Sequence, residues 1–239
     1  MRIQTAMSGQ LIVNADDFGA CSGVNRGIVE CHRAGIVTST SLMVDEPASE
    51  EGARLALARS ELSVGLHLKI TDEYARPAID VRTPPALSAE LERQIERFER
   101  LAGREPTHLD SHHNIHLVPE LAPGFADLAE SRGLMLRGSP IRYVPSFYGQ
   151  WDGETHLEQI GAGTLVAIVG DEAGEGITEL GCHPGYVDPT LESTYSAERE
   201  TELRTLCLSH LRTRVEELGV KLVSSTTARR LVVSGHLGE

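Results

Sequence analysis

The feature that most constrains the fold is a regular alternation between short β-rich runs and amphipathic helical segments. Strands are expected at 10–15, 37–44, 62–70, 106–112, 177–183 and 220–225. Helices are expected between them, at 22–36, 48–60, 88–103, 119–133 and 196–219. Strand–helix alternation at this spacing predicts a parallel sheet covered by helices.

The number of strand–helix units favours a closed or nearly closed α/β barrel over an open doubly wound sheet. The open alternative lacks support, because no GxGxxG motif follows the first strand. The sequence also has no internal repeat, low-complexity tract or linker. We therefore expect a distorted TIM-like (β/α) barrel in a single domain over residues 1–239.

Two stretches are less regular. Residues 74–87 are rich in proline and lack periodicity, which predicts a loop, and Ser88 is then expected to cap the helix at 88–103. Residues 139–176 are expected to combine loops with one helix.

Composition limits the partners. The formal net charge of −13 argues against nucleic acid and anionic membranes, because both require a basic surface. The first ten residues lack the apolar run of a signal peptide, and no segment has the roughly 18 apolar residues of a membrane span. The four cysteines form no CxxC pair, which predicts reduced thiols in a cytoplasmic protein.

Four groups of polar residues fall at or just past the ends of predicted strands. The stretch HLDSHHNIHL, at 108–117, holds four of the ten histidines. Each group alone has an ordinary explanation, such as a solvated turn or a hydrogen-bonded core histidine. The carboxyl ends of barrel strands converge, however, so all four groups are expected to meet. They are Asn14, Asp16 and Asp17; His67; Asp110, His112, His113 and His116; and His183.

This set of side chains suits hydrolysis. One carboxylate and two imidazoles form a three-ligand metal site with open positions, and a divalent ion there lowers the pKa of bound water to roughly 7. A second carboxylate can accept the proton of the water, and a histidine across the cleft can protonate a leaving group. The pattern predicts a hydrolase of an ester or amide bond.

Five motifs carry a resemblance to a known family. LIVNADDFG, GIVTST, GLHL, PTHLDSHHNIH and CHPGYVD occur in order from Leu11 to the final strand. They resemble the YdjC-like carbohydrate deacetylases, which include chitooligosaccharide deacetylases and the hopanoid-pathway deacetylase. The resemblance implies a NodB-like deacetylase architecture on the α/β barrel. It also implies removal of N-acetyl groups from an amino sugar or N-acetylated oligosaccharide by a metal-activated water.

The resemblance also implies roles for individual residues. Asp17, His67 and His112 would be the metal ligands. Asp16 would be the general base, and His183 would protonate the departing amine.

Three further residues would support these groups. Asp110 and His116 would orient the ligands, and Arg137 would lie near the site. Asn114 stands where the family often has a histidine, which puts any proton relay at that position in doubt. The compact stretch 139–176 is expected to shape the substrate cleft.

The predicted cofactor is one divalent metal ion, either magnesium or zinc, since an Asp/His/His set suits zinc and the carboxylate also tolerates magnesium. The predicted partner is a small N-acetylated sugar, with a homodimer left open. Two alternatives are a metal-dependent phosphoesterase on a barrel scaffold and a non-catalytic sugar-binding protein.

Overall fold

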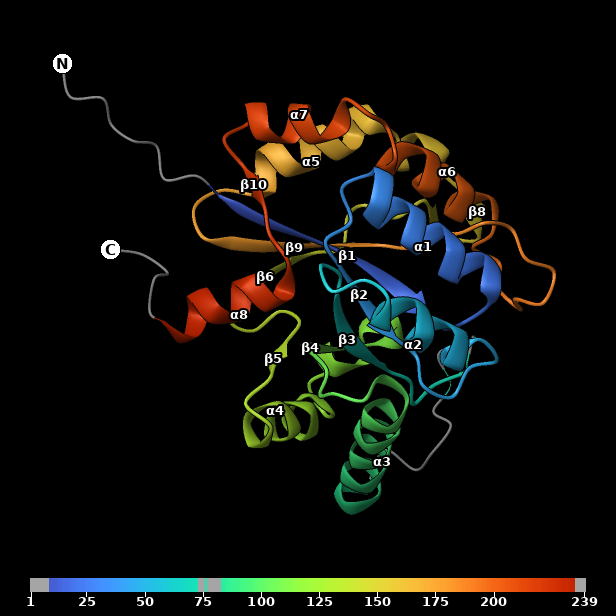
Figure 1. The fold of residues 1–239 in the computed structure, drawn as a ribbon, viewed down its shortest axis with the longest axis vertical. Helices are drawn as coiled ribbons and strands as arrows, with labels where there is room; N and C mark the ends of the chain where they lie inside the picture. Colours follow the sequence, from blue (N-terminus) through green and yellow to red (C-terminus); the bar gives the residue numbers. More distant parts are fainter. Residues whose placement is uncertain (1–8, 73–75, 77–82, 235–239) are drawn as a thin grey trace.

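A computed structural model describes residues 9–72, 76 and 83–234. Its main sheet has the strand order β5-β4-β3-β2-β1-β9-β6, with β10 pairing with the amino-terminal part of β1 (Figure 1). All of its ladders are parallel, as the alternation predicts. The strands are β1 Gln10–Phe18, β2 Ser39–Leu42, β3 Ser63–Leu68, β4 His108–Ser111, β5 Met135–Leu136, β6 Arg142–Val144, β9 Ile177–Cys182 and β10 Lys221–Leu222.

Helices surround the sheet (Figure 1). In chain order they are α1 Ser22–Ala34, α2 Ser49–Leu57, α3 Pro84–Ala102, α4 Ala122–Ser131, α5 Ala162–Glu172, α6 Ala197–Leu206, α7 Leu211–Glu217 and α8 Ser225–Val233. Two 3-10 segments, η1 His112–Leu117 and η2 Leu157–Ile160, and an antiparallel hairpin of β7 Gln150–Trp151 with β8 Glu154–Thr155 complete the described elements. Among the described residues, no helix is long and apolar enough to cross a membrane.

The sheet is curled but not closed. Its outermost strands, β5 and β6, have two and three residues, and no ladder joins them within the described residues. The predicted α/β barrel is therefore confirmed in a distorted, half-barrel form. Its strands point the same way, so their carboxyl ends share one edge.

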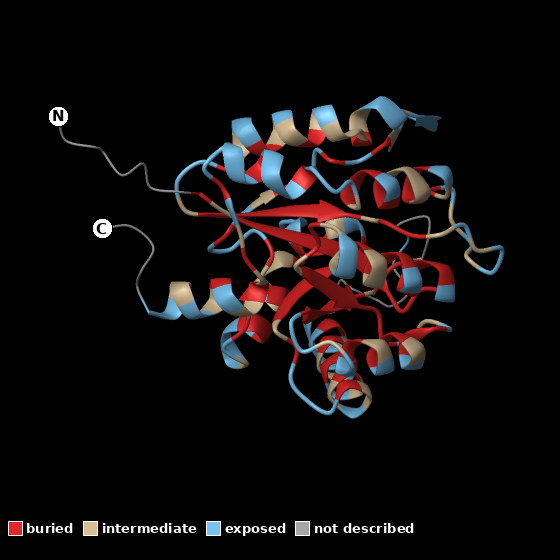
Figure 2. Cartoon of the chain, turned by 45° about the horizontal axis from the view of Figure 1, so that its top comes forward, coloured by how far each residue is buried: buried red, intermediate tan, exposed pale blue. Residues whose placement is uncertain are grey.

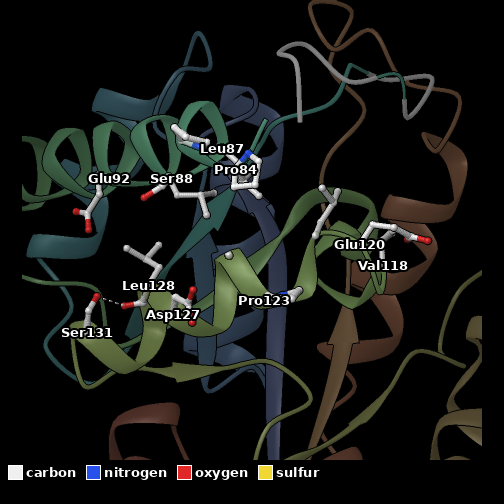
Figure 3. A pocket seen from close by; sticks show the side chains of 14 residues that line it. Pro84, Leu87, Ser88, Glu92, Val118, Glu120, Pro123, Asp127, Leu128 and Ser131 are labelled. Atoms are coloured by element: carbon white, nitrogen blue, oxygen red, sulfur yellow. Dashed lines mark hydrogen bonds between the residues drawn. The ribbon is translucent and has the colours of Figure 1, made fainter. Parts of the chain in front are cut away.

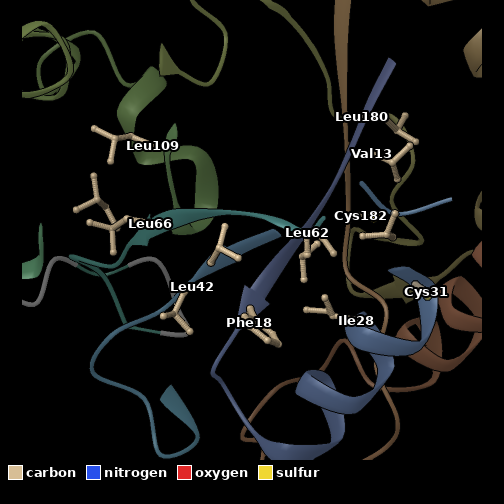
Figure 4. Packing of buried hydrophobic residues seen from close by; sticks show 14 of the residues in the cluster. Val13, Phe18, Ile28, Cys31, Leu42, Leu62, Leu66, Leu109, Leu180 and Cys182 are labelled. Atoms are coloured by element: carbon tan, nitrogen blue, oxygen red, sulfur yellow. The ribbon is translucent and has the colours of Figure 1, made fainter. Parts of the chain in front are cut away.

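The core lies between the sheet and its helices, and the central strands β1, β2, β3, β4 and β9 are buried along nearly their whole length (Figure 2). Val13, Leu66, Leu109 and Leu180 from different strands belong to one apolar cluster with Ile28 of α1 (Figure 4). Each such side chain stabilises the fold by roughly 1.5–3 kcal/mol when removed from water. This packing fixes the strand ends that carry the polar groups.

The start of α3 corrects two predictions. The helix begins at Pro84, with prolines in its first turn, and Thr83 precedes it. Proline is tolerated there because the first turn leaves its backbone N–H groups without helical partners. Ser88 therefore lies inside the helix and does not cap it. Residues 84–87 of the predicted loop are helical, and 74–75 and 77–82 lie outside the described residues.

The predicted helix at 196–219 is two helices, α6 and α7, separated by a turn at 207–210. Leu203 and Leu206 of α6 join the core on the side of α1, whereas Leu211 and Val215 of α7 pack beside α5. One straight helix could not bury both pairs.

Other elements also differ from the predictions. The last strand contains only Lys221–Leu222, and α8 follows it after Ser224, whose side chain accepts a hydrogen bond from the Thr227 backbone. The strand at 106–112 is shortened to 108–111. The β7–β8 hairpin turns at Asp152 and Gly153, which have φ values of 54° and 78°. An Asp-Gly pair is a known signal for such a two-residue turn, and the prediction of loops with one helix missed it.

Candidate metal and catalytic site

The three predicted metal ligands come together from three strand ends. Asp17 Oδ1 lies 3.4 Å from His67 Nε2 and 3.4 Å from His112 Nδ1. One donor atom from each residue lies within 4.8 Å of the others, and all three residues are buried. Two donors held tetrahedrally at about 2.1 Å from one ion would be about 3.4 Å apart, so the spacing fits a small divalent cation.

A bulge in β1 brings two consecutive carboxylates into one cluster. The register between β1 and β2 shifts between Ala15 and Phe18, and Asp17 has a φ of 66°. A regular strand would direct Asp16 and Asp17 to opposite faces, whereas here both approach His67. A left-handed conformation is rare for a residue other than glycine, and it places Asp17 at the site.

Asp110 fixes the orientation of His67. Its Oδ1 lies 2.7 Å from His67 Nδ1, which leaves Nε2 directed toward Asp17. A carboxylate behind a histidine in this way orients the ring and raises its basicity as a ligand. The contact is the one expected for Asp110.

The electrostatics of the cluster favour a cation. Burial alone would lower the pKa of His67, but the carboxylates of Asp110 and Asp17 raise it to about 10. Asp17 Oδ1 is buried and accepts no hydrogen bond from the described residues. A buried carboxylate oxygen that accepts no hydrogen bond and faces two imidazoles at 3.4 Å belongs to a donor set that a divalent ion would satisfy.

Asp16 is held by Arg137. The guanidinium reaches Asp16 Oδ1 at 2.6 Å and Oδ2 at 2.7 Å, and Asn14 Nδ2 donates to Oδ1 at 2.8 Å. Burial works against ionisation, but Arg137 outweighs it and lowers the pKa of Asp16. Asp16 is therefore an ionised carboxylate beside the three ligands. Arg137 is 2% exposed and also pairs with Asp110 and Glu179, each at 2.7 Å.

His183 faces Asp16 from the end of β9. Its Nε2 lies 3.9 Å from Asp16 Oδ2, so the structure brings the two predicted proton-transfer groups close together. Burial lowers the pKa of His183 to about 4, although the carboxylates of Asp16 and Asp17 oppose this shift. The imidazole is consequently neutral near pH 7 before any cation or substrate binds.

Helix α6 contributes buried ionisable side chains that the sequence did not reveal as part of the site. Arg199 donates to Asp17 Oδ2 at 2.6 Å and to the Tyr195 carbonyl at 3.0 Å. Glu202 accepts from the His183 backbone N–H and from the Tyr195 hydroxyl, both at 2.5 Å. Burial raises the pKa of Glu202 to about 8. One signal was present: 197–206 has only two large apolar residues, so its buried face had to include charged ones.

The other residues singled out in the sequence lie around the η1 turn. His116 is buried and bonds within its own turn, with Nδ1 2.6 Å from Ser111 Oγ. Asn114 accepts from Arg137 at 3.2 Å and has a φ of 49°, a conformation that asparagine tolerates. His113 Nδ1 lies 3.2 Å from Thr71 Oγ1. Asn114 thus contacts the residue that holds Asp16.

A separate groove of about 920 Å³ lies between α3 and α4 (Figure 3). Its walls are largely apolar and include Leu87, Leu91, Leu121 and Leu128. None of the predicted site residues lines it, so its chemistry is independent of the cluster described above.

A family model and individual related proteins both match nearly the whole chain. The family model described as YdjC-like protein matches residues 10–217. A chitooligosaccharide deacetylase from Salmonella dublin is 34% identical over 247 residues, covering 90% of this chain and 97% of that protein. A chitooligosaccharide deacetylase from Citrobacter koseri is 35% identical over 250 residues, covering 91% of this chain and 98% of that protein.

Solved structures resemble the fold. A protein from Enterococcus faecalis, provisionally named a cellobiose-phosphate cleavage protein, superposes with a TM-score of 0.76 at 27% identity, covering 92% of this chain and 98% of that one. The catalytic domain of a peptidoglycan N-acetylglucosamine deacetylase from Eubacterium rectale superposes with a TM-score of 0.62 at 10% identity, covering 92% of this chain and 90% of that one. The second likeness concerns the fold alone.

Proposed function

The chain belongs to the family of YdjC-like proteins, and we propose that it is a metal-dependent hydrolase that removes the N-acetyl group from an amino sugar or N-acetylated oligosaccharide. One observation carries the proposal: Asp17, His67 and His112 meet beside Asp16 and His183. The names of the relatives at 34–35% identity, chitooligosaccharide deacetylases, support an N-acetylated sugar as the substrate.

Each protein group has a defined task in this reaction. A divalent cation bound by Asp17, His67 and His112 would polarise the amide carbonyl and lower the pKa of the attacking water. Asp16 accepts the proton of the water, and Arg137 keeps its carboxylate ionised and directed into the site.

His183 protonates the departing amine. Because its imidazole is neutral near pH 7, it must gain a proton during the reaction before it can donate one. Asp16 Oδ2 lies 3.9 Å from His183 Nε2, so a small side-chain movement would bring the two atoms within hydrogen-bond distance and let Asp16 pass on the proton that it took from the water. Base and acid are then two ends of one proton path.

The alternative functions have less support. A phosphoesterase needs cationic groups that face the substrate, yet the guanidinium groups of Arg137 and Arg199 are both paired with carboxylates. A protein that only binds sugar needs neither Asp16 nor His183 in these positions. The cytoplasmic location, the single domain and the oligomeric state stay predictions.

Acetate release tests the proposed function. Protein stripped of metal by a chelator should release no acetate from N,N′-diacetylchitobiose, and one equivalent of Zn²⁺ or Mg²⁺ should restore the reaction. Phosphate release from a sugar phosphate should remain at background. If metal-loaded protein releases no acetate from N-acetylglucosamine or its oligomers, the proposal is wrong.

A further inference from the structure

Tyr148 is a partly exposed aromatic side chain beside the predicted general acid. Its ring centroid lies 5.5 Å from that of His183, with the rings at 72°. Tyr148 is 37% exposed, whereas Asp16, Asp17, His67 and His112 are at most 9% exposed. The Tyr148 ring is therefore a partly solvent-exposed aromatic surface next to the buried cluster.

The exposed ring is held in a fixed position. Phe147, the preceding residue, is completely buried, and the backbone N–H of the following residue, Gly149, donates to the Tyr195 hydroxyl at 2.9 Å. The Tyr148 ring also stacks on the Tyr195 ring at 4.5 Å, with 6° between their planes. Tyr195 is itself fixed by its hydrogen bond to Glu202. A partly exposed ring anchored on both sides is a preformed surface.

Tyr148 keeps part of its surface open to a ligand. Tyr195 is 4% exposed and stacks on one face of the Tyr148 ring, whereas Tyr148 itself is 37% exposed. A pyranose ring has an apolar face of C–H groups that matches an aromatic face in size and polarity. Its substituents then extend sideways, toward groups at the edge of the aromatic ring.

We infer that Tyr148 is the surface on which the sugar ring that carries the acetamido group stacks, which places that group between His183 and the Asp17–His67–His112 cluster. This inference rests on the proposed deacetylase function and names the residue that selects a pyranose over other acetylated molecules. Its ligand class is an N-acetylated amino sugar in the pyranose form.

Paired variants test the stacking surface. Tyr148→Ala should raise KM for N,N′-diacetylchitobiose roughly threefold to tenfold more than it raises KM for 4-nitrophenyl acetate, which has no pyranose. Tyr148→Phe keeps the ring and should restore the wild-type ratio of the two KM values. Leu57→Ala, which removes an exposed apolar side chain on α2, is the matched control and should leave this ratio unchanged. Circular dichroism confirms that each variant is folded.

Two results would overturn the inference: equal changes in KM for both substrates in Tyr148→Ala, or a loss in Tyr148→Phe as large as that in Tyr148→Ala. Calorimetric binding of diacetylchitobiose separates this inference from the proposed reaction. If wild type binds the disaccharide and Tyr148→Ala binds it at least threefold more weakly, the surface is supported even when no acetate is released. If wild type releases acetate but both proteins bind equally, the surface is wrong and the reaction stands.

Discussion

The two walls of the site are built from different kinds of structure. The strand wall consists of Asp16 and Asp17 in the bulge of β1, His67 on β3 and His112 directly after β4. The helix wall consists of Arg199 and Glu202 of α6, together with Tyr195 just before the helix. Strand-wall side chains point at one another across the space in which chemistry is proposed. The helix-wall side chains support the site from behind: Arg199 donates a hydrogen bond to Asp17 Oδ2, and Glu202 accepts one from the His183 backbone.

The difference between the walls assigns them different tasks. Parallel strand ends bring residues that are distant in sequence within a few ångströms, which suits ligands and proton-transfer groups. Arg199 reaches the outer oxygen of Asp17, and Glu202 binds the backbone of His183, so one helix sets the positions of both a ligand and the acid. Strand-wall substitutions should therefore abolish metal binding or turnover, whereas helix-wall substitutions should only weaken them.

The largest loss is expected when a ligand is removed from the strand wall. His67→Gln and Asp17→Asn should lower kcat/KM on the order of 10³-fold or more, because the cation that activates water is no longer held. Equilibrium dialysis should show weakened zinc binding in both variants. The controls are His210→Gln and Asp127→Asn, at exposed positions outside the cluster, which should bind metal and turn over normally. Full metal occupancy in His67→Gln would break the assignment.

Substitutions of the two proton-transfer groups should lower turnover without loss of metal, unlike substitutions of the ligands. Asp16→Asn is expected to keep its metal and lose on the order of 10²–10⁴ in turnover. His183→Gln should reduce amide hydrolysis severely, because the departing amine then has no proton donor. An activated ester, whose leaving group needs no proton, should be much less affected. Near-normal turnover in Asp16→Asn, or equal losses on amide and ester in His183→Gln, would exclude these roles.

Helix-wall substitutions should have intermediate effects. Arg199→Met leaves Asp17 in place but removes the group that holds its Oδ2, so metal affinity should fall about 10–100-fold while the metal still binds at saturation. Glu202→Gln should lower kcat more than it changes metal affinity, since it contacts His183 and not the ligands. If Arg199→Met lost all metal even at saturation, the distinction between the walls would fail.

The last prediction concerns the pH dependence of stability, which we attribute in part to the buried side chain of His108. His108 Nε2 lies 3.0 Å from Asn14 Oδ1, and burial lowers the pKa of His108 to about 4, against about 6.5 in an unfolded chain. The unfolded chain binds more protons between these values, so this histidine makes stability fall as pH decreases from about 6.5 to 4.

His108→Gln should remove that part of the pH dependence. Across this window, the free energy of unfolding of wild type should fall by up to about 3 kcal/mol more than that of His108→Gln. Urea denaturation at pH 7.5, 5.5 and 4.5 measures the difference. Parallel pH curves for the two proteins would show that His108 is protonated in the folded state.

The sequence indicated that the strand-wall residues would lie together, as they do in the structure, but the helix wall was not recognised from it. Strand-end residues such as Asp17 and His67 are recognisable because parallel topology alone makes them neighbours. Arg199 and Glu202 lie in a charged helix whose sequence is typical of a solvent-exposed one, and the packing of α6 against α1 and η2 accompanies their burial. The register of β5 and β6 was equally hidden, since strands of two or three residues give no periodic signal.

Anomalous diffraction at the zinc edge, from crystals equilibrated with Zn²⁺, tests the central claim most directly. One strong peak is expected, with Asp17 Oδ1, His67 Nε2 and a nitrogen of His112 each at ~2.0–2.3 Å and Asp16 outside the coordination shell. A peak bound by other residues, or one that includes Asp16 in place of Asp17, would contradict it.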